Sequence, residues 1–512
     1  MVFSSSIFLF WFLPIFLGVY FLVDRRYKNA VALFASLLFY GFGSPKFLII
    51  LLLSILIDFF LVRQIDKSPV EKRRKLFLTF SVILNIGLLA YFKYANFFID
   101  NFNAILSAFG TPPVRWTKVV LPIGISFFTF QKMSYSVDVY RKTSAPLKNI
   151  TDYALFIMLF PQLIAGPIVR YNEIADQITD RQANETIDNK IHGFDRFVIG
   201  LSKKMLIANI LAEYVDQVFA LPTHEIGLST AWLGILAYTF QIYFDFSGYS
   251  DMAIGIGRMI GFKFPENFNS PYISQSVSEF WKRWHITLGS WMMDYLYIPL
   301  GGNRRGKRRT YINLWIVFFL SGLWHGAAWT FVAWGAFHGL FIVIDKMFWH
   351  KASKKIGKLP RVLITFVIVM IGWVLFRSDT IGYAVQYVGA MFGANGSTPA
   401  LFVNSQFTFT LLVAVFFSFI GLLPRITEEL EGLIYGTNPL EGQTRETNPL
   451  EGQTTGGQTQ GTNPLKGQTT EGQTRGSAPT RVLVGLIIVV LLILSASFIL
   501  KGSFNPFIYF RF

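Results

Sequence analysis

Long apolar segments recur along almost the whole of this 512-residue chain, and they limit its possible folds more than any other feature. The first covers residues 7–23 and the last residues 482–500, and each approaches the roughly 20 residues that a helix needs to cross a bilayer. Inside a bilayer the backbone N–H and C=O groups must bond within their own segment, which favours helices. We therefore predict an all-α, polytopic membrane protein with about ten to twelve membrane helices.

The composition supports this fold class and excludes several functions. Hydrophobic residues make up 52% of the chain and charged residues only 15%, whereas soluble proteins carry about 25% charged residues. The chain has no cysteine, which excludes disulfides, thiolate metal sites and a cysteine nucleophile. The net charge of +16 fits Lys- and Arg-rich loops on the cytosolic side of a membrane. No compact hydrophilic domain is present to bind nucleic acid, so no nucleic-acid partner is expected.

Basic stretches predict the topology. Residues 25–26, 72–75 and 303–309 should lie in the cytosol, because positively charged loops stay on that side of the membrane. Residues 7–23 lack the basic start and the small-residue cleavage site of a signal peptide, so we expect this segment to be retained, with Met1 outside. The expected location is the bilayer of the cell (inner) membrane.

Several polar residues lie in or beside apolar segments and are too polar to face lipid. They are Gln131, Asp138, Gln162, Gln241, Asp245 and Asp251. The segment 153–169 is also interrupted by Pro161, Gly166 and Pro167. Such groups survive at membrane depth where protein or water surrounds them. For any single residue, hydrogen bonding between helices explains the pattern equally well. The clustering between residues 121 and 251 favours a polar interior.

Residues 436–480 differ sharply from the rest of the chain. The unit TNPLEGQT begins at Thr437 and recurs at Thr447 and at Thr462, the last copy with Lys466 in place of Glu. Gly, Thr, Gln and Pro cannot build a core here, which favours a disordered linker over a small solenoid. We predict a membrane domain at 1–435, a repeat linker at 436–480, and a C-terminal membrane helix and tail at 481–512.

Six histidines are the main candidates for chemistry. His285 lies beside an apolar stripe whose members recur at helical spacing: Trp281, Trp284, Leu288 and Trp291. An amphipathic helix in the membrane interface explains this pattern as well as a functional site does. Surface or interface placement is expected for the histidines in polar sequence or at the end of a span, which are His192, His224 and His350.

His325 is expected to lie deep in the membrane. A helix that begins near Tyr311, after the cytosolic loop 303–309, would carry His325 about 20 Å along its axis. An ionisable side chain at this depth is costly unless it serves a polar cavity. Small residues around it would let a helix or an acyl chain approach closely, namely Gly322, Gly326, Ala327 and Ala328.

A metal site is not expected. On a straight helix His338 would point about 140° away from His325, so these two do not form a metal pair. The chain has no H-E-x-x-H zinc motif, no Walker loop and no G-x-S-x-G elbow. What remains is base chemistry by histidine, because a neutral imidazole can take a proton from an attacking hydroxyl. Desolvation at membrane depth would help to keep the ring neutral.

Five motifs, in this order, resemble the membrane-bound O-acyltransferase (MBOAT) family, and within it the branch of bacterial alginate O-acetyltransferase membrane subunits. They are LPIGISFFTFQ at 121–131 with VDVYR at 137–141, FPQLIAGPIVRY at 160–171, QIYFDFSGYSDMA at 241–253, FWKRWHITLGSW at 280–291 and LSGLWHGAAW at 320–329. The resemblance covers roughly residues 7–425. The repeat linker is not part of the family pattern.

The resemblance implies an all-helical bundle around a central tunnel or funnel. His325 matches the catalytic histidine of the family and His285 matches its second motif histidine. Candidates for contacting the substrate are Gln131, Gln162, Asp245, Trp284 and Trp324.

The resemblance also implies an enzyme, an O-acetyltransferase without a tightly bound cofactor or metal. Its donor would be acetyl-CoA or another acyl thioester in the cytosol, and its final acceptor an exported polysaccharide or cell-wall glycan. An extracytoplasmic SGNH-type acetyltransferase is the expected protein partner. D-alanyl transfer to a teichoic acid-like polymer is the alternative within the same machinery. A transporter or a scaffold is the alternative outside it. A transporter predicts internal inverted repeats, which the sequence does not show, and would give the two histidine motifs no chemical role.

Overall fold

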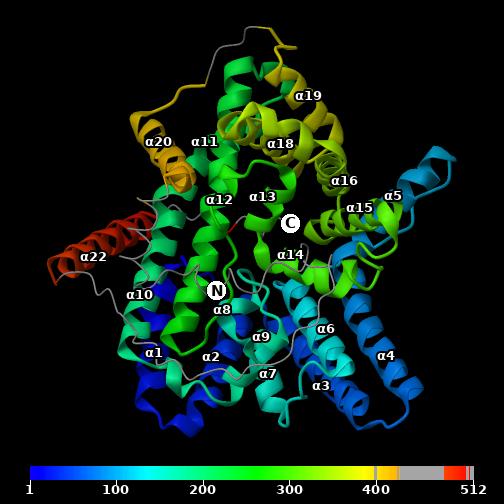
Figure 1. Cartoon of the computed structure of the whole chain (residues 1–512), viewed down its shortest axis with the longest axis vertical. Coiled ribbons are helices and arrows are strands. Elements are labelled where there is room, and N and C mark those ends of the chain that lie inside the picture. The colour runs from blue at the N-terminus through cyan, green and yellow to red at the C-terminus, as the bar shows by residue number, and fades with distance from the viewer. Residues whose placement is uncertain (397–400, 424–425, 427–477, 503–506, 508–512) are drawn as a thin grey trace, which may run out of the picture.

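The computed structural model describes the chain except residues 397–400, 424–425, 427–477, 503–506 and 508–512 (Figure 1). The described part is built from helices, and its only β-type pairing is one isolated bridge between Phe268 and Trp284. The all-α prediction is therefore confirmed. Residues 436–477 of the predicted repeat linker lie outside the described part, so the linker remains a prediction.

The N-terminal helices are α1 (Leu13–Leu22), α2 (Lys28–Gly43), α3 (Pro45–Lys67), α4 (Glu71–Leu89), α5 (Ala95–Ala108) and α6 (Ile125–Arg141). The middle of the chain forms α7 (Ile150–Met158), α8 (Phe160–Leu163), α9 (Tyr171–Thr179), α10 (Ile187–Ser202), α11 (Asn209–Ala220) and α12 (Leu228–Met259). The remaining helices are α13 (Val277–Arg283), α14 (Ile286–Met292), α15 (Gly306–His325), α16 (Trp329–Ile344), α17 (His350–Ala352), α18 (Lys358–Arg377), α19 (Ile381–Met391), α20 (Ser405–Phe419) and α22 (Ala478–Leu500).

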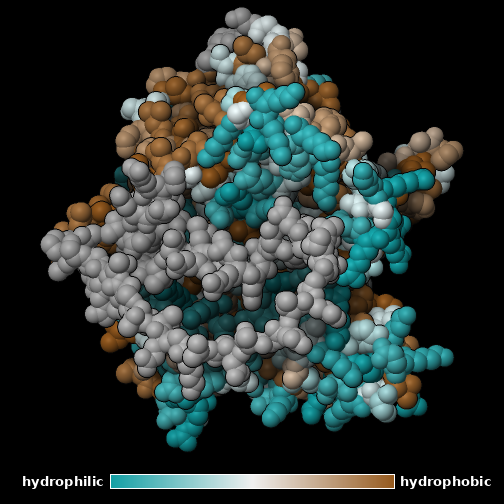
Figure 2. Space-filling model, viewed as in Figure 1, coloured by the Kyte–Doolittle hydropathy of each residue, from teal (hydrophilic) through white to brown (hydrophobic). Residues whose placement is uncertain are grey.

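Six helical stretches in the described part are long and apolar enough to cross a membrane. They are Pro45–Lys67, Glu71–Ala108, Trp329–Ile356, Lys358–Arg377, Ser405–Leu422 and Val482–Leu500. This set is smaller than the estimate from apolar segments, because some of those segments break into shorter helices and others carry buried polar residues. Large apolar side chains on these helices are exposed, such as Phe409 at 70%. Figure 2 shows such residues on the flanks of the molecule, as a bilayer requires, with hydrophilic residues toward the middle and the lower edge.

The long helix α12 runs through the middle of the molecule and is buried along most of its length (Figure 1). Its acidic residues do not face lipid, because basic residues of α10 and of the π-helical turn η5 (Lys203–Ala208) pair with them. Asp245 pairs with Lys204, and Asp251 pairs with Arg196 at 3.0 Å and with Lys203 at 2.6 Å. All six polar residues singled out from the sequence are buried, which confirms the prediction of a polar interior.

The last helix, α22, lies against α10 (Figure 1). Ser495 is fully buried and its Oγ lies 3.2 Å from Oγ of Ser202 in a hydrogen bond. Ile488 on the same helix is 5% exposed. The C-terminal membrane helix therefore packs onto the MBOAT-like bundle at the side of α10.

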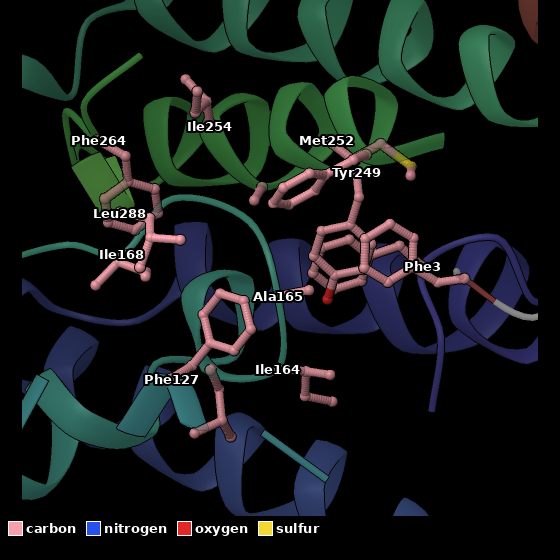
Figure 3. Close-up of a cluster of buried hydrophobic side chains, with 14 of the residues drawn as sticks. Phe3, Phe127, Ile164, Ala165, Ile168, Tyr249, Met252, Ile254, Phe264 and Leu288 are labelled. Carbon is pink, nitrogen blue, oxygen red and sulfur yellow. The ribbon is translucent and has the colours of Figure 1, made fainter. Parts of the chain in front are cut away.

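The interrupted segment 153–169 is a broken helix. α7 ends at Met158, α8 covers only Phe160–Leu163, and residues 164–170 are extended or bent. Gly166 has φ +96°, a conformation that glycine adopts without a steric cost, and a Cβ there would lie 3.3 Å from Cβ of Ala253 on α12. Figure 3 shows Ile164, Ala165 and Ile168 of this segment within a buried apolar cluster that also includes residues of α6, α12 and α14.

The largely apolar segment 312–334, which contains His325, is also broken. α15 ends at His325 and α16 begins at Trp329, so the two helices form an antiparallel hairpin. Two glycines allow their close packing: a Cβ on Gly322 would lie 2.3 Å from the carbonyl oxygen of Phe331, and one on Gly335 would lie 2.4 Å from that of Phe318. The small residues around His325 therefore admit a helix.

Candidate active site

The His285 motif is not one continuous helix. α13 ends at Arg283, Trp284 is extended, and His285 has φ 49° and ψ 52°, in the left-handed region that non-glycine residues seldom adopt. Residues 267–269 take the place of the missing helical turn. The backbone N–H of Ile286 donates to the carbonyl of Asn267 at 3.0 Å, and that of Asn269 donates to the carbonyl of Arg283 at 2.9 Å. The predicted helical stripe through this motif is therefore wrong, because backbone pairing with residues 267–269 breaks the helix at His285.

The side chain of Asn267 orients the imidazole of His285. Asn267 Oδ1 accepts hydrogen bonds from the backbone N–H of Thr287 at 3.4 Å and from its hydroxyl at 2.9 Å, while Nδ2 donates to Ser250 at 3.1 Å. Nδ1 of His285 lies 3.0 Å from the same Oδ1. Because this oxygen can only accept, Nδ1 of His285 must carry the proton in the neutral ring, and Nε2 is then the acceptor nitrogen.

The broken segment 159–170 contacts this hydrogen-bond network through Ile168. The backbone N–H of Ile168 donates to the hydroxyl of Thr287 at 2.9 Å, and that hydroxyl in turn donates to Asn267. Ile168 and the neighbouring Leu288 both lie in the buried cluster of Figure 3. The interrupted motif at 160–171 therefore positions His285 through Thr287 and Asn267.

His325 is the last residue of α15 and lies among aromatic rings. Its ring centroid is 4.9 Å from that of Trp324, 5.0 Å from that of Trp334 and 5.3 Å from that of Phe376, each in an edge-to-face arrangement. The residue is 4% exposed. The helix begins at Gly306, five residues before the predicted start, so His325 ends a helix of 20 residues.

Trp324 brings the two histidine motifs together. Its ring lies 6.1 Å from His285 and 4.9 Å from His325, centroid to centroid. It also stacks on Phe130 of α6, at 5.3 Å and 19°. His285 and His325, 40 positions apart in the sequence, thus both lie close to one indole, which places them and the candidate Trp324 in one buried cluster.

The other candidate residues differ in their surroundings. Asp245 is held in the buried ion pair with Lys204, and Nε2 of Gln162 donates to the carbonyl of Phe156 at 2.6 Å, so both have structural partners. Trp284 packs against Trp373, with ring centroids 4.9 Å apart. Gln131 is fully buried, and its side-chain amide has no hydrogen-bond partner within the described part of the chain. Within the same described residues Oε1 of Gln162 and Nε1 of Trp324 also lack a hydrogen-bond partner, so Gln131 is the candidate whose whole side-chain amide has unused hydrogen-bonding capacity.

The expected 140° angle between His325 and His338 assumed one straight helix. The two residues lie on separate helices, because the chain breaks at 326–328. The ring of Trp334 lies 5.0 Å from each histidine ring, and Nε1 of Trp281 donates to Nδ1 of His338 at 3.3 Å. Within the residues that the structure describes, no group of three or more His, Asp or Glu side chains is placed to hold a metal ion.

Sequence reasoning does not single out Asn267, although it orients His285. Its local sequence, PENFN, carries no distinctive motif, and its role depends on a contact across 18 positions. Thr287 lies inside the motif at 280–291, but nothing in that motif indicates its role. Only a structure shows that these two side chains share one hydrogen-bond network with His285.

Comparison with known proteins identifies the family of this chain. The model of the membrane-bound O-acyltransferase (MBOAT) family matches residues 86–376. A "Probable alginate O-acetylase AlgI" of Azotobacter vinelandii is 44% identical over 438 residues, which cover 84% of this chain and 87% of that protein. A "Peptidoglycan O-acetyltransferase" of Helicobacter pylori is 39% identical, with coverage of 77% and 80%. A "Teichoic acid D-alanyltransferase" of Bacillus subtilis is 30% identical, with coverage of 50% and 68%.

The matched region contains both histidine motifs, the broken helix before α9 and the buried helix α12, and it makes up more than half of the chain. The all-helical fold, the membrane helices and the relatives all indicate the same family. This chain belongs to the membrane-bound O-acyltransferase family and is a multi-pass membrane acyltransferase.

Proposed function

We propose that this chain is an O-acetyltransferase that passes an acetyl group from a cytosolic thioester toward an exported polysaccharide or cell-wall glycan. Two of the relatives support acetyl as the transferred group, since they are named for O-acetylation of alginate and of peptidoglycan. The structural observation that carries the proposal is the pair of buried histidines that both lie close to Trp324.

In the proposed reaction, the imidazole of His325 takes the proton from an acceptor hydroxyl as its oxygen attacks the thioester carbonyl. A new C–O bond forms, the C–S bond breaks, and the thiolate leaves with the proton that His325 returns. A hydroxyl has a single proton, so only one imidazole acts as the base. His285, whose Nε2 is the acceptor nitrogen, is proposed to orient the substrate beside it.

The proposed donor is acetyl-CoA. The exposed basic residues at 304–308 offer charges that would attract its phosphates on the cytosolic side. The proposed partner is an extracytoplasmic SGNH-type acetyltransferase that completes transfer to the glycan. D-alanyl transfer is a second candidate, because two relatives that match about half of this chain are teichoic acid D-alanyltransferases.

The test is to delete the gene and restore it with the wild-type chain, with His325→Ala, or with His350→Ala. His350 is an exposed histidine outside the buried cluster and is the matched control. Base-labile acetate and D-alanine are then measured on the exported glycan and on the cell wall. Loss of a positioned base should lower acetyl transfer by about 10² to 10⁴-fold in the His325→Ala strain, whereas the His350→Ala strain should match the wild type. Normal acetate release by His325→Ala protein at normal abundance would contradict the proposal, and release of D-alanine instead of acetate would favour the second candidate.

A further inference from the structure

The C-terminal end of α15 carries His325, and its backbone needs hydrogen-bond partners there. A helix leaves its last four carbonyl groups without partners inside the helix. In α15 these carbonyls belong to Gly322, Leu323, Trp324 and His325. The first accepts a hydrogen bond from the backbone N–H of Gly326 at 3.4 Å. The other three need donors from elsewhere, because leaving them unpaired in a buried site is costly.

Two consecutive residues of another segment supply those donors. The hydroxyl of Tyr94 donates to the carbonyl of Leu323 at 2.6 Å. The ammonium of Lys93 donates to the carbonyl of Trp324 and, at 3.0 Å, to that of His325. Both residues belong to the π-helical turn η3 (Ala90–Tyr94) between α4 and α5. All four terminal carbonyls of α15 are therefore bonded.

The charge of Lys93 suits this position. The C-terminal end of a helix carries a partial negative charge, so a cation there is stabilising. An ammonium group has three N–H donors, and Nζ of Lys93 also donates to Oγ of Ser126, at 3.5 Å. The charge also lies 5.9 Å from the centroid of the Trp324 ring. Because its donors already have partners, Lys93 positions the backbone and does not itself contact the reacting atoms.

The same segment also holds the start of α16. Nε1 of Trp329 donates to Oδ1 of Asn101 on α5 at 2.8 Å, and the rings of Trp329 and Phe97 lie 5.5 Å apart. The connection 326–328 is thus fixed at both ends by residues of η3 and α5. This second contact does not involve Lys93 or Tyr94.

We propose that Lys93 and Tyr94 form a cap on the C-terminal end of α15 that positions His325 for proton transfer. The catalytic part of this inference rests on the proposed function, whereas the cap itself does not. Without the cap, the last turn of α15 and the connection 326–328 lose their order, and the imidazole of His325 moves out of its reactive position.

The first test measures the order of the connection without using activity. The chain has no native cysteine, so Ala327→Cys, at a half-buried position, reports on the connection through its rate of labelling by a membrane-permeant maleimide. Labelling should become several-fold faster when Lys93→Met is added and return to the original rate with Lys93→Arg. The side chain of native His224 is 79% exposed, so His224→Cys is the control and should label at the same rate in every background.

The second test measures acetyl-CoA turnover in membrane vesicles. Lys93→Met should lower kcat by about 10²-fold, since a displacement of about 1 Å can cost that much, while the KM for acetyl-CoA stays within about twofold. Lys93→Arg should restore most of the rate. Tyr94→Phe, which removes one hydroxyl, is the milder variant and should lower kcat by severalfold, and it keeps the test decisive if Lys93→Met reaches the membrane poorly.

Unchanged labelling at position 327 in both Lys93→Met and Tyr94→Phe would overturn the cap, whatever the activity. Altered labelling with unchanged kcat would overturn its positioning role. If labelling is altered but His325→Ala still transfers acetyl normally, His325 is not the base. The cap itself would still be supported in that case.

Discussion

The segments that carry His285 and His325 are both buried and both contact Trp324, but they are held in place by different means. His285 lies between two helices of seven residues each, with its backbone in the left-handed region. Such a conformation costs about 1–3 kcal/mol, so the surroundings must stabilise it. The stabilising contacts are the backbone hydrogen bonds of Arg283 and Ile286 with residues 267–269, together with the side-chain hydrogen bonds of Asn267.

His325, in contrast, ends a helix of 20 residues and has ordinary helical backbone. Its position depends on main-chain carbonyls capped by Lys93 and on aromatic packing against Trp334 and Phe376. The ring of His285 is therefore oriented by individual hydrogen bonds, whereas His325 is positioned by the helix that it ends. Single side-chain replacements around His285 should therefore alter the orientation of its ring.

The strongest test of this comparison is a double-mutant cycle on the two histidines. His325→Ala should lower the rate of acetyl transfer by about 10² to 10⁴-fold, and His285→Ala should lower it less. The double variant should be no slower than His325→Ala, because groups that act as one unit are not additive. The measurement is the initial rate of acetyl-CoA turnover in membrane vesicles, normalised to the amount of inserted protein. Losses that multiply in the double variant would mean that the histidines act in separate steps.

The control for this cycle is His350→Ala, which should keep the wild-type rate. His338 is a poor control, because it is fully buried and accepts a hydrogen bond from Trp281. Its replacement would leave a cavity among aromatic rings and lower stability by itself.

A smaller effect is expected from Asn267→Leu. This change removes the acceptor for Nδ1 of His285 and lets the ring rotate or change tautomer. A lost hydrogen bond of about 1–3 kcal/mol corresponds to a loss of about 5 to 150-fold in rate. Asn267→Asp keeps an oxygen at the same place and should retain more activity than Asn267→Leu at equal protein abundance. If Asn267→Leu is as active as the wild type, the orientation of His285 is not set by this residue.

The smallest effect is expected from Thr287→Val, which has nearly the same shape but no hydroxyl. The backbone N–H of Thr287 still donates to Asn267, so transfer should fall only by severalfold. The buried N–H of Ile168 loses its acceptor, which should lower the free energy of unfolding by about 1–3 kcal/mol. Thermal unfolding in detergent measures this loss, and Thr287→Ser, which keeps the hydroxyl, is the matched control. A Thr287→Val protein as stable as Thr287→Ser would show that the bond to Ile168 contributes nothing.

Several features of this protein could be predicted from the sequence because they depend on local pattern. The apolar segments require membrane helices, and polar residues within them require a protein interior, as found for Asp245 and Asp251. The two histidine motifs could be recognised from their residue spacing and their resemblance to a family. The small residues beside His325 indicated close packing, which Gly322 and Gly335 provide.

Other features were decided only by the tertiary structure, because they depend on contacts between distant residues. The helical spacing of tryptophans around His285 predicted a continuous stripe, but pairing with residues 267–269 broke the helix and set its ring. The segment 312–334 is largely apolar and long enough to be one span, so hydropathy alone does not indicate the break after His325. Its cap comes from Lys93, which lies 232 positions away in the sequence. Local propensity determines which segments form helices, whereas the ends of those helices are fixed by whichever distant groups satisfy their backbone hydrogen bonds.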